Sequence, residues 1–186
     1  LRQIVDDMRR PVPMNRLLQG DVGAGKTIVA LIAALVAMEN GLQVALMAPT
    51  EILAAQHSRT LSQYLGASRF DAVRLSGGMT ASSRSQTIQA LAGGDAHLVV
   101  GTHALLQAPI VFRKLGLVII DEQHRFGVDQ RAQLRDKGWC PDVLVMTATP
   151  IPRTLAMTSY GDLDISTIKD LPPGRRPVKT IARSER

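Results

Sequence analysis

The chain has 186 residues, enough for one domain with a full core and too few for two large domains. Aromatic residues make up only 3% of the sequence, so we expect an aliphatic core without aromatic platforms that stack single-stranded bases. The net charge of +6 suits a polyanionic partner, but a solvated basic surface explains it equally well. Part of the excess positive charge lies near the C-terminus, in a cluster that suits a linker as well as a binding face: Arg175, Arg176, Lys179, Arg183 and Arg186.

A single cysteine, Cys140, excludes an intrachain disulfide and fits a reducing, cytoplasmic compartment. One cysteine and four scattered histidines give no metal-ligand spacing, and we expect His57 and His97 to be structural. The longest apolar run, Ile28–Met38, is well short of the roughly 20 residues that span a bilayer. The chain opens without Met, in a charged and helix-like segment that does not resemble a signal peptide, so we expect it to be part of a longer protein.

Short apolar runs alternate with helix-like segments along the chain. In chain order, the apolar runs predict strands at Arg16–Gln19, Val44–Ala48, Ala72–Leu75, Leu98–Gly101, Leu117–Asp121 and Val143–Thr147. The segments between them predict helices at Thr27–Asn40, Glu51–Leu65, Ser83–Leu91, Asp129–Lys137 and Ile151–Tyr160. This alternation, with nearly all-apolar strands, predicts an α/β fold whose mainly parallel sheet carries helices on both faces. The helix from Thr27 is apolar nearly all round and should be deeply buried.

A glycine-rich loop joins the first predicted strand to the first predicted long helix. It reads Gly20-Asp21-Val22-Gly23-Ala24-Gly25-Lys26-Thr27 and fits the phosphate-loop pattern G-x-x-x-x-G-K-[ST]. Glycines let successive N–H groups turn inward around a polyphosphate, and the helix N-terminus adds its positive dipole end. We expect Lys26 to contact the β- and γ-phosphates of ATP and the Thr27 hydroxyl to ligate Mg²⁺. The alternative is a glycine-rich turn that happens to precede Lys-Thr.

Two acids, Asp121 and Glu122, end the apolar strand at Leu117–Asp121. A buried strand that delivers a carboxylate to the carboxyl edge of a parallel sheet is what a phosphate-loop ATPase needs for Mg²⁺. We expect Asp121 to hold the ion and Glu122 to polarise the attacking water. The alternative is a solvated acidic turn after a core strand.

Several short motifs resemble those of superfamily 2 helicases. Asp121-Glu122-Gln123-His124 is similar to the DEQH form of motif II, and Thr147-Ala148-Thr149 is similar to motif III, which links nucleotide state to DNA binding. The resemblance therefore implies coupling roles for His124, Thr147 and Thr149. Otherwise His124 would be a core histidine, and the two threonines would cap the following helix.

A second set of motifs resembles DNA-contacting segments of the same superfamily. Ala48-Pro49-Thr50-Glu51 is similar to motif Ia, and Gly101-Thr102-His103 is similar to a motif that contacts the DNA backbone. The resemblance implies backbone contacts at Thr50, Gly77, Gly78, Thr102 and His103. Small and hydroxylated residues suit this task because phosphates approach main-chain amides closely. The alternative is that these are ordinary loop residues.

Longer strings narrow the resemblance to the RecG family of bacterial helicases, which remodel stalled forks and branched DNA. These strings are GDVGAGKT, DEQHRFGV, TATPIPRT, YGDLD and LPPGR, and they extend over essentially the whole chain. The resemblance implies a first RecA-like helicase domain over residues 1–170 and a linker over 171–186. It also implies partners: double-stranded or branched DNA, and a second RecA-like domain and a wedge domain in the same polypeptide. The transcription–repair coupling translocases (Mfd family) share two of these strings, but they usually read DEEH where Gln123 stands here.

The family places arginines that complete the ATP site on the second RecA-like domain. We therefore expect the isolated chain to bind nucleotide but to be nearly inactive as an ATP hydrolase. Two other classes stay open from the residues alone: a phosphate-loop module that senses nucleotide without moving DNA, and a kinase or metabolic ATPase unrelated to DNA. The string TATPIPRT argues against both.

Overall fold

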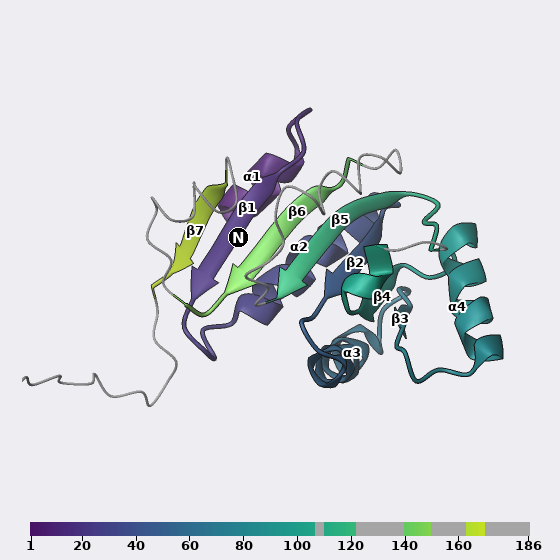
Figure 1. Cartoon of the computed structure of the whole chain (residues 1–186). Helices are drawn as coiled ribbons and strands as arrows, with labels where there is room; N and C mark the ends of the chain where they lie inside the picture. Colours follow the sequence, from purple (N-terminus) through teal and green to yellow (C-terminus); the bar gives the residue numbers. More distant parts are fainter. Residues whose placement is uncertain (107–109, 122–139, 150–162, 170–186) are drawn as a thin grey trace, which may run out of the picture.

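A single parallel sheet organises the chain in the computed structural model, which describes residues 1–106, 110–121, 140–149 and 163–169. The strands are β1 (Asn15–Gly20), β2 (Gln43–Met47), β3 (Ala72–Arg74), β4 (Leu98–Gly101), β5 (Leu115–Asp121), β6 (Asp142–Thr147) and β7 (Asp164–Ile168). They lie in the order β3-β4-β2-β5-β6-β1-β7, and every pairing between them is parallel (Figure 1). The predicted α/β class is therefore confirmed.

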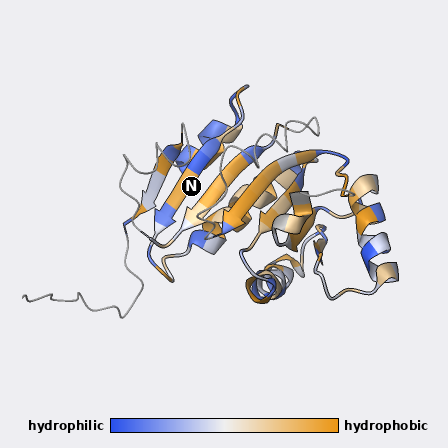
Figure 2. Ribbon diagram, in the orientation of Figure 1, coloured by the Kyte–Doolittle hydropathy of each residue, from blue (hydrophilic) through white to orange (hydrophobic). Residues whose placement is uncertain are grey.

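The central strands are buried on both faces, which explains their continuous apolar sequences. All residues of β2 and β4 are buried, and apart from Gln43 and Gly101 they are apolar; the central strands are mainly coloured as hydrophobic in Figure 2. Alternate side chains enter two separate core clusters because successive residues of a strand point to opposite faces. In β2, for example, Leu46 belongs to one cluster, while Ala45 and Met47 belong to the other.

Helices cover both faces of the sheet. The helices are α1 (Arg2–Met8), α2 (Lys26–Glu39), α3 (Glu51–Leu65) and α4 (Ala81–Gly93), with a short 3-10 helix, η1 (His103–Leu106). Side chains of α1, α2 and α3 enter the cluster that contains Leu46, whereas Leu91 of α4 and Leu105 of η1 enter the opposite cluster. None of the helices within the described ranges has the length and apolarity that a bilayer span requires.

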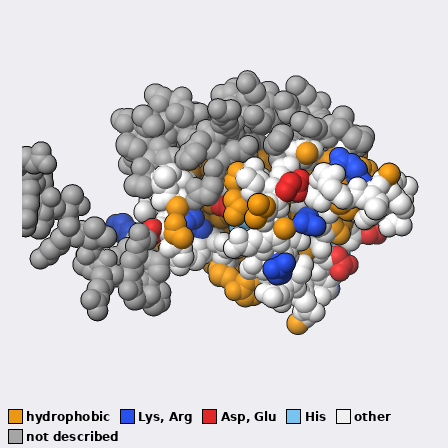
Figure 3. All heavy atoms as spheres, turned by 60° about the horizontal axis from the view of Figure 1, so that its bottom comes forward, with side chains coloured by type: hydrophobic (Ala, Val, Ile, Leu, Met, Phe, Trp, Pro, Cys, Tyr) orange, Lys and Arg blue, Asp and Glu red, His pale blue; other side chains and the backbone are white. Residues whose placement is uncertain are grey.

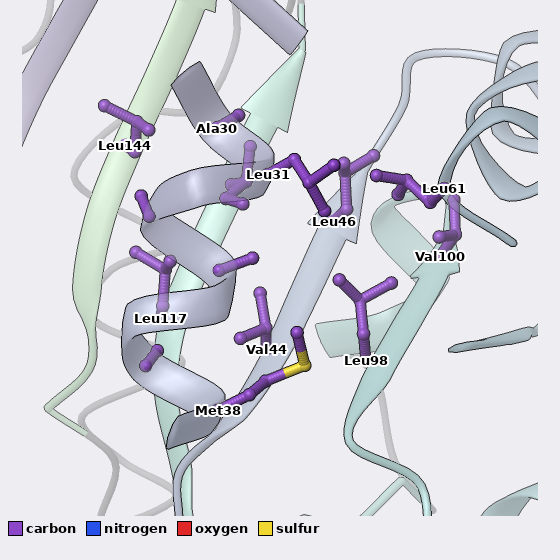
Figure 4. Close-up of a cluster of buried hydrophobic side chains, with 14 of the residues drawn as sticks. Ala30, Leu31, Met38, Val44, Leu46, Leu61, Leu98, Val100, Leu117 and Leu144 are labelled. Carbon is purple, nitrogen blue, oxygen red and sulfur yellow. The ribbon is translucent and has the colours of Figure 1, made fainter. Parts of the chain in front are cut away.

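Helix α2 lies against the middle of the sheet, but it is not buried all round as its composition predicts. Ala30, Leu31 and Met38 face the strands (Figure 4), where they pack into the same cluster as Val44 and Leu117. The other side of the helix is half-buried, and Ile28 is 39% exposed. The helix is therefore deeply buried only on the side that faces the sheet.

The six predicted strands are present with ends shifted by at most two residues, and the helix at Glu51–Leu65 has the predicted bounds. The sequence interpretation missed η1 and β7, whereas α1 confirms the helix-like character of the opening residues. Strand β7 reads Asp-Ile-Ser-Thr-Ile at an edge of the sheet, so it lacks the apolar run that identified the others. The predicted helices at Asp129–Lys137 and Ile151–Tyr160 lie outside the described residues, as does the proposed linker over 171–186.

A buried polar cluster fastens α1 to the β1–β7 edge. The Arg16 guanidinium donates from Nε to Oδ2 of Asp7 at 2.6 Å and from Nη1 to Oγ of Ser166 at 2.9 Å. Ser166 in turn donates to Oε1 of Gln3 at 2.6 Å. The side chains of Arg16 and Asp7 are only 8% and 7% exposed, and each is the buried partner of the other, with the exposed Asp164 and Arg10 as second partners. We call Gln3, Asp7, Arg16 and Ser166 the α1 clamp.

Candidate nucleotide site

The candidate residues follow strands that end at one edge of the sheet. Because all strands are parallel, their carboxyl ends point the same way (Figure 1), and this edge is where open α/β sheets bind ligands. The strand order divides the edge into two halves. The half formed by β5, β6 and β1 carries the predicted ATP residues, and the half formed by β3, β4 and β2 carries the predicted DNA residues.

The loop after β1 has the backbone shape that its glycines predict. Gly23 and Gly25 have φ values of +80° and +89°, where a side chain is strained. Gly25 is the N-cap of α2, and the helix begins at Lys26, so its first N–H groups face the loop. The Ala24 amide donates to the carbonyl of Asp21 at 3.1 Å and closes the turn. The loop is therefore a positively polarised concavity at a helix N-terminus.

The ammonium group of Lys26 lies across this loop. Its Nζ donates to the carbonyl oxygens of Gly20 at 2.7 Å and Asp21 at 3.0 Å. Thr27 lies in the first turn of α2 and is half-buried. Both side chains are thus held at the start of the helix, where the phosphate-loop pattern places them.

Asp121, the last residue of β5, lies level with Leu18 near the end of β1, the strand that leads into the loop. It pairs with Met146 of β6, and Met146 pairs with Leu18 of β1. Two strand spacings separate Asp121 from Leu18, or roughly 10 Å. The loop begins two residues after Leu18, so phosphates held there and the Asp121 carboxylate would lie on the same side of the sheet edge.

His57, expected from the sequence to be structural, contacts Asp121. Its Nε2 lies 2.5 Å from Oδ2 of Asp121, and the two side chains are 13% and 14% exposed. His97, by contrast, accepts a hydrogen bond from the Asp71 amide and packs edge-on against Phe70, as a structural histidine does. Sequence reasoning missed His57 because 64 residues separate it from Asp121.

The residues of motif III form a compact hydrogen-bonded turn next to the loop. The hydroxyls of Thr147 and Thr149 share a hydrogen bond of 2.8 Å, and the Thr149 amide donates to Oγ1 of Thr147 at 3.2 Å. Gln19, the residue before the phosphate loop, donates from Nε2 to the Thr149 carbonyl at 3.4 Å. Gln19 was not singled out from the sequence, although its position beside Thr147 follows from the register of β1 and β6. A direct contact therefore connects motif III to the strand that carries the loop.

The predicted DNA residues lie on the other half of the edge, and the fold explains some of them without DNA. Thr50 is the N-cap of α3, and its hydroxyl accepts from the Leu53 amide at 3.3 Å. The carbonyl of Thr102 accepts from the Leu105 amide at the start of η1. His103 begins η1, and its side chain is not among those described.

Gly77 and Gly78 are different, because the fold gives no reason for glycine at either position. Both are exposed, neither has a positive φ, and an added Cβ would meet no described atom within 4 Å. The Gly77 amide donates to Oε1 of Glu51 at 3.2 Å, so this loop is joined to the first residue of α3. Open space above two glycines permits close approach to the main chain.

Two of the predicted site residues, Glu122 and His124, lie outside the described residues, together with Gln123. Their assignments as water-polarising base and coupling residue stay predictions.

The opposite edge of the sheet has a hollow of about 380 Å³ that contains basic residues. Arg69 is paired there with Glu39, and Arg113 donates from Nη1 to the Gly93 carbonyl at 3.0 Å. Gln43 lies at the base of the hollow and donates to two main-chain carbonyls. These three side chains already have partners within the fold, so we assign no ligand to this basic hollow.

A parallel α/β sheet with a phosphate-type loop after β1 and an acid at the end of β5 defines the class as a RecA-like nucleotide-binding domain. The sequence matches the DEAD/DEAH box helicase family over residues 4–158, and the chain belongs to that family.

Comparisons with individual proteins confirm the resemblance to the RecG family. The ATP-dependent DNA helicase RecG of Acidithiobacillus ferridurans is 56% identical over 97% of the chain, and that of Pasteurella multocida is 53% identical over 99%. A solved structure of RecG bound to a three-way DNA junction superposes with a TM-score of 0.82, at 48% identity over 95% of the chain. The chain spans about a quarter of the length of these proteins. The Mfd alternative is not favoured.

Proposed function

We propose that this chain is the first RecA-like, ATP-binding domain of a RecG-type DNA helicase that couples ATP hydrolysis to movement on double-stranded or branched DNA. The observation that carries the proposal is the placement of the glycine loop, Lys26 and Asp121 on one half of one sheet edge. The relatives that match this chain are ATP-dependent DNA helicases. A cytoplasmic, nucleoid-associated location and a role at stalled forks go with this proposal.

In this proposal the loop residues Gly20–Thr27 bind the phosphates of ATP through main-chain N–H groups. Lys26 exchanges its two carbonyl partners for phosphate oxygens, and charge-assisted hydrogen bonds to these oxygens are the stronger ones. Thr27 and Asp121 offer a hydroxyl and a carboxylate to Mg²⁺, which needs only one or two carboxylates when phosphates also bind it. No group of three or more His, Cys, Asp or Glu side chains that suits a metal lies in the described part of the chain. The ion would neutralise charge on the transferring phosphoryl group, and Glu122 would polarise the water.

We place the DNA contacts on the half of the edge formed by β3, β4 and β2, at Thr50, Gly77, Gly78, Thr102 and His103. The open space around the two glycines supports close approach of a DNA backbone. Basic side chains on the face shown in Figure 3 are scattered singly rather than gathered in one patch. Hydroxyls and main-chain amides would therefore make much of the contact, and the turn of Thr147 and Thr149, with His124, would transmit the state of the nucleotide.

The second RecA-like domain and the wedge domain are the partners that the proposal requires in the same polypeptide. Lys26 and Mg²⁺ neutralise the γ-phosphate from one side only, and an arginine from a second domain contributes roughly 10³–10⁵ in rate. The isolated chain should therefore bind nucleotide, hydrolyse it negligibly and separate no strands.

ATP hydrolysis by the full-length protein tests the proposal when it is measured without DNA, with linear duplex and with a three-way junction. We expect stimulation by DNA, with the junction the better activator, and a loss of both rates in Lys26→Ala. A nucleotide-sensing module would bind ATP without DNA-stimulated turnover, and an unrelated kinase or ATPase would turn over independently of DNA. Either result would contradict the proposal.

A further inference from the structure

The His57–Asp121 hydrogen bond joins the two halves of the carboxyl edge. His57 belongs to α3, which follows β2 and begins beside Thr50, whereas Asp121 ends β5 on the nucleotide half. The distance of 2.5 Å between Nε2 and Oδ2, with both side chains mostly buried, makes this a fixed contact. An ionised carboxylate only accepts hydrogen bonds, so Nε2 of His57 carries the proton.

Packing alone does not explain a histidine at this position of α3. His57 follows Ala54 by three residues and precedes Leu61 by four, so the three side chains share one face of the helix. Ala54 and Leu61 are buried in the apolar core, at 0% and 1% exposure. An apolar side chain at position 57 would continue that face, whereas the imidazole provides a hydrogen-bond partner for Asp121 at the end of β5.

We propose that His57 is a positioning residue for the magnesium site. Its Nε2–H holds Oδ2 of Asp121, which fixes the rotamer of the carboxylate and leaves the second oxygen outside this hydrogen bond for the ion. Hydrogen bonds from neighbouring groups orient metal-ligating side chains, and their loss typically costs 10- to 100-fold in metal affinity. The inference rests on the proposed function, in which Asp121 serves Mg²⁺.

The test compares His57→Leu with His57→Gln in the full-length protein. Leucine keeps apolar packing but has no donor, whereas the glutamine amide keeps an N–H at a similar reach. Calorimetry with ADP would be run in EDTA and over a series of Mg²⁺ concentrations. His57→Leu should bind ADP normally in EDTA but require roughly 10- to 100-fold more Mg²⁺ for the ion-dependent gain in affinity. His57→Gln should restore most of the wild-type dependence.

His97→Ala is the matched control, because this histidine contacts Phe70 and Asp71 and not Asp121. An unchanged Mg²⁺ requirement in His57→Leu, or an equal loss in both His57 variants, would overturn the positioning role. The proposed nucleotide site would still stand if Lys26→Ala weakened ADP binding in the same assay. An unchanged affinity in Lys26→Ala would instead reject the nucleotide site itself.

Discussion

The α1 clamp and the carboxyl edge use charged side chains in opposite ways. In the α1 clamp, Arg16 and Asp7 are buried against each other, and Arg16 also donates a hydrogen bond to Ser166. At the carboxyl edge, Lys26 bonds to two main-chain carbonyls of its own loop, and the glycines of that loop hold a backbone shape that other residues resist. One region has satisfied its charges internally, and the other keeps a cation that can change partners.

This difference separates residues that maintain the fold from residues that bind a ligand. Removing one partner of a buried ion pair leaves a poorly compensated charge, so substitutions in the α1 clamp should lower the stability of the fold. Removing Lys26 leaves two carbonyl oxygens at a partly exposed loop, where water can replace it. The predictions below test whether stability and binding separate in this way.

Arg16→Ala should have the largest effect, a loss of unfolding free energy. The change leaves the buried Asp7 with only the mostly exposed Arg10 as a cationic partner, and breaking a buried pair costs up to about 3–5 kcal/mol. Urea unfolding followed by circular dichroism measures it. The double variant Arg16→Met with Asp7→Leu is the control, because replacing both partners by apolar residues is often neutral. A double variant as unstable as Arg16→Ala would show that the ion pair itself is not what matters.

Lys26→Ala should have the opposite effect to Arg16→Ala: it should weaken nucleotide binding with little change in stability. Hydrogen bonds to charged groups contribute about 1.5–3 kcal/mol, or roughly 10- to 100-fold in Kd for ADP. Calorimetry gives the affinity, and the same unfolding assay gives the stability. Lys114→Ala, on the opposite edge, is the matched lysine variant and should bind ADP normally. If Lys26→Ala lowered stability but not ADP affinity, Lys26 would be a residue that maintains the fold, like those of the α1 clamp, and not a ligand-binding residue.

Thr50→Asp separates helix capping from DNA contact on the other half of the edge. Aspartate caps helices as well as threonine does, so the stability of α3 should be retained. Its charge should repel DNA phosphates, and we expect a several-fold loss of DNA affinity at low salt in the full-length protein. Thr50→Ser keeps both properties and is the control. Unchanged DNA binding in Thr50→Asp, measured by fluorescence anisotropy, would leave only the capping role.

The smallest expected effect is that of Asp142→Asn, at the start of β6. Burial raises the pKa of Asp142 above its usual 3.8, opposed by the hydrogen bond from the Met14 amide and assisted by the nearby Asp7. A raised pKa means that the ionised carboxyl costs stability above that pKa and that protonation relieves the cost as pH falls. Asparagine keeps the acceptor without the charge, so the variant should be slightly more stable at pH 7. The advantage should disappear as pH falls toward 4, and a variant less stable than wild type at pH 7 would contradict this account.

The parallel sheet and the phosphate loop were predictable because their signals are local. Apolar runs between helix-like segments identified six strands, and the spacing of Gly20, Gly25 and Lys26 identified the loop. Strand β7 was missed because its sequence, Asp-Ile-Ser-Thr-Ile, has no continuous apolar run and only Ser166 in it is buried. Its place in the sheet depends on pairing with β1, which no local pattern encodes.

The site contacts that sequence reasoning missed join residues distant in the chain. His57 and Asp121 meet because β2, which leads into α3, lies next to β5, and Gln19 meets Thr149 because β6 lies next to β1. Each pair follows from strand order, which the sequence did not provide. Conversely, Thr50 was assigned to DNA by resemblance alone, and the structure adds that its hydroxyl caps α3.

The central claim is that nucleotide binds at the carboxyl edge and leaves the α1 clamp and the basic hollow unaffected. Hydrogen–deuterium exchange of this chain with and without Mg-ADP tests it directly, because exchange reports where a ligand protects main-chain amides. We expect protection in the loop at Gly20–Thr27 and at the end of β5, and no change in α1, in β7 or around Arg113 and Lys114. Protection around Arg113 and Lys114, with none in the glycine loop, would show that the nucleotide binds at the opposite edge and would contradict the account.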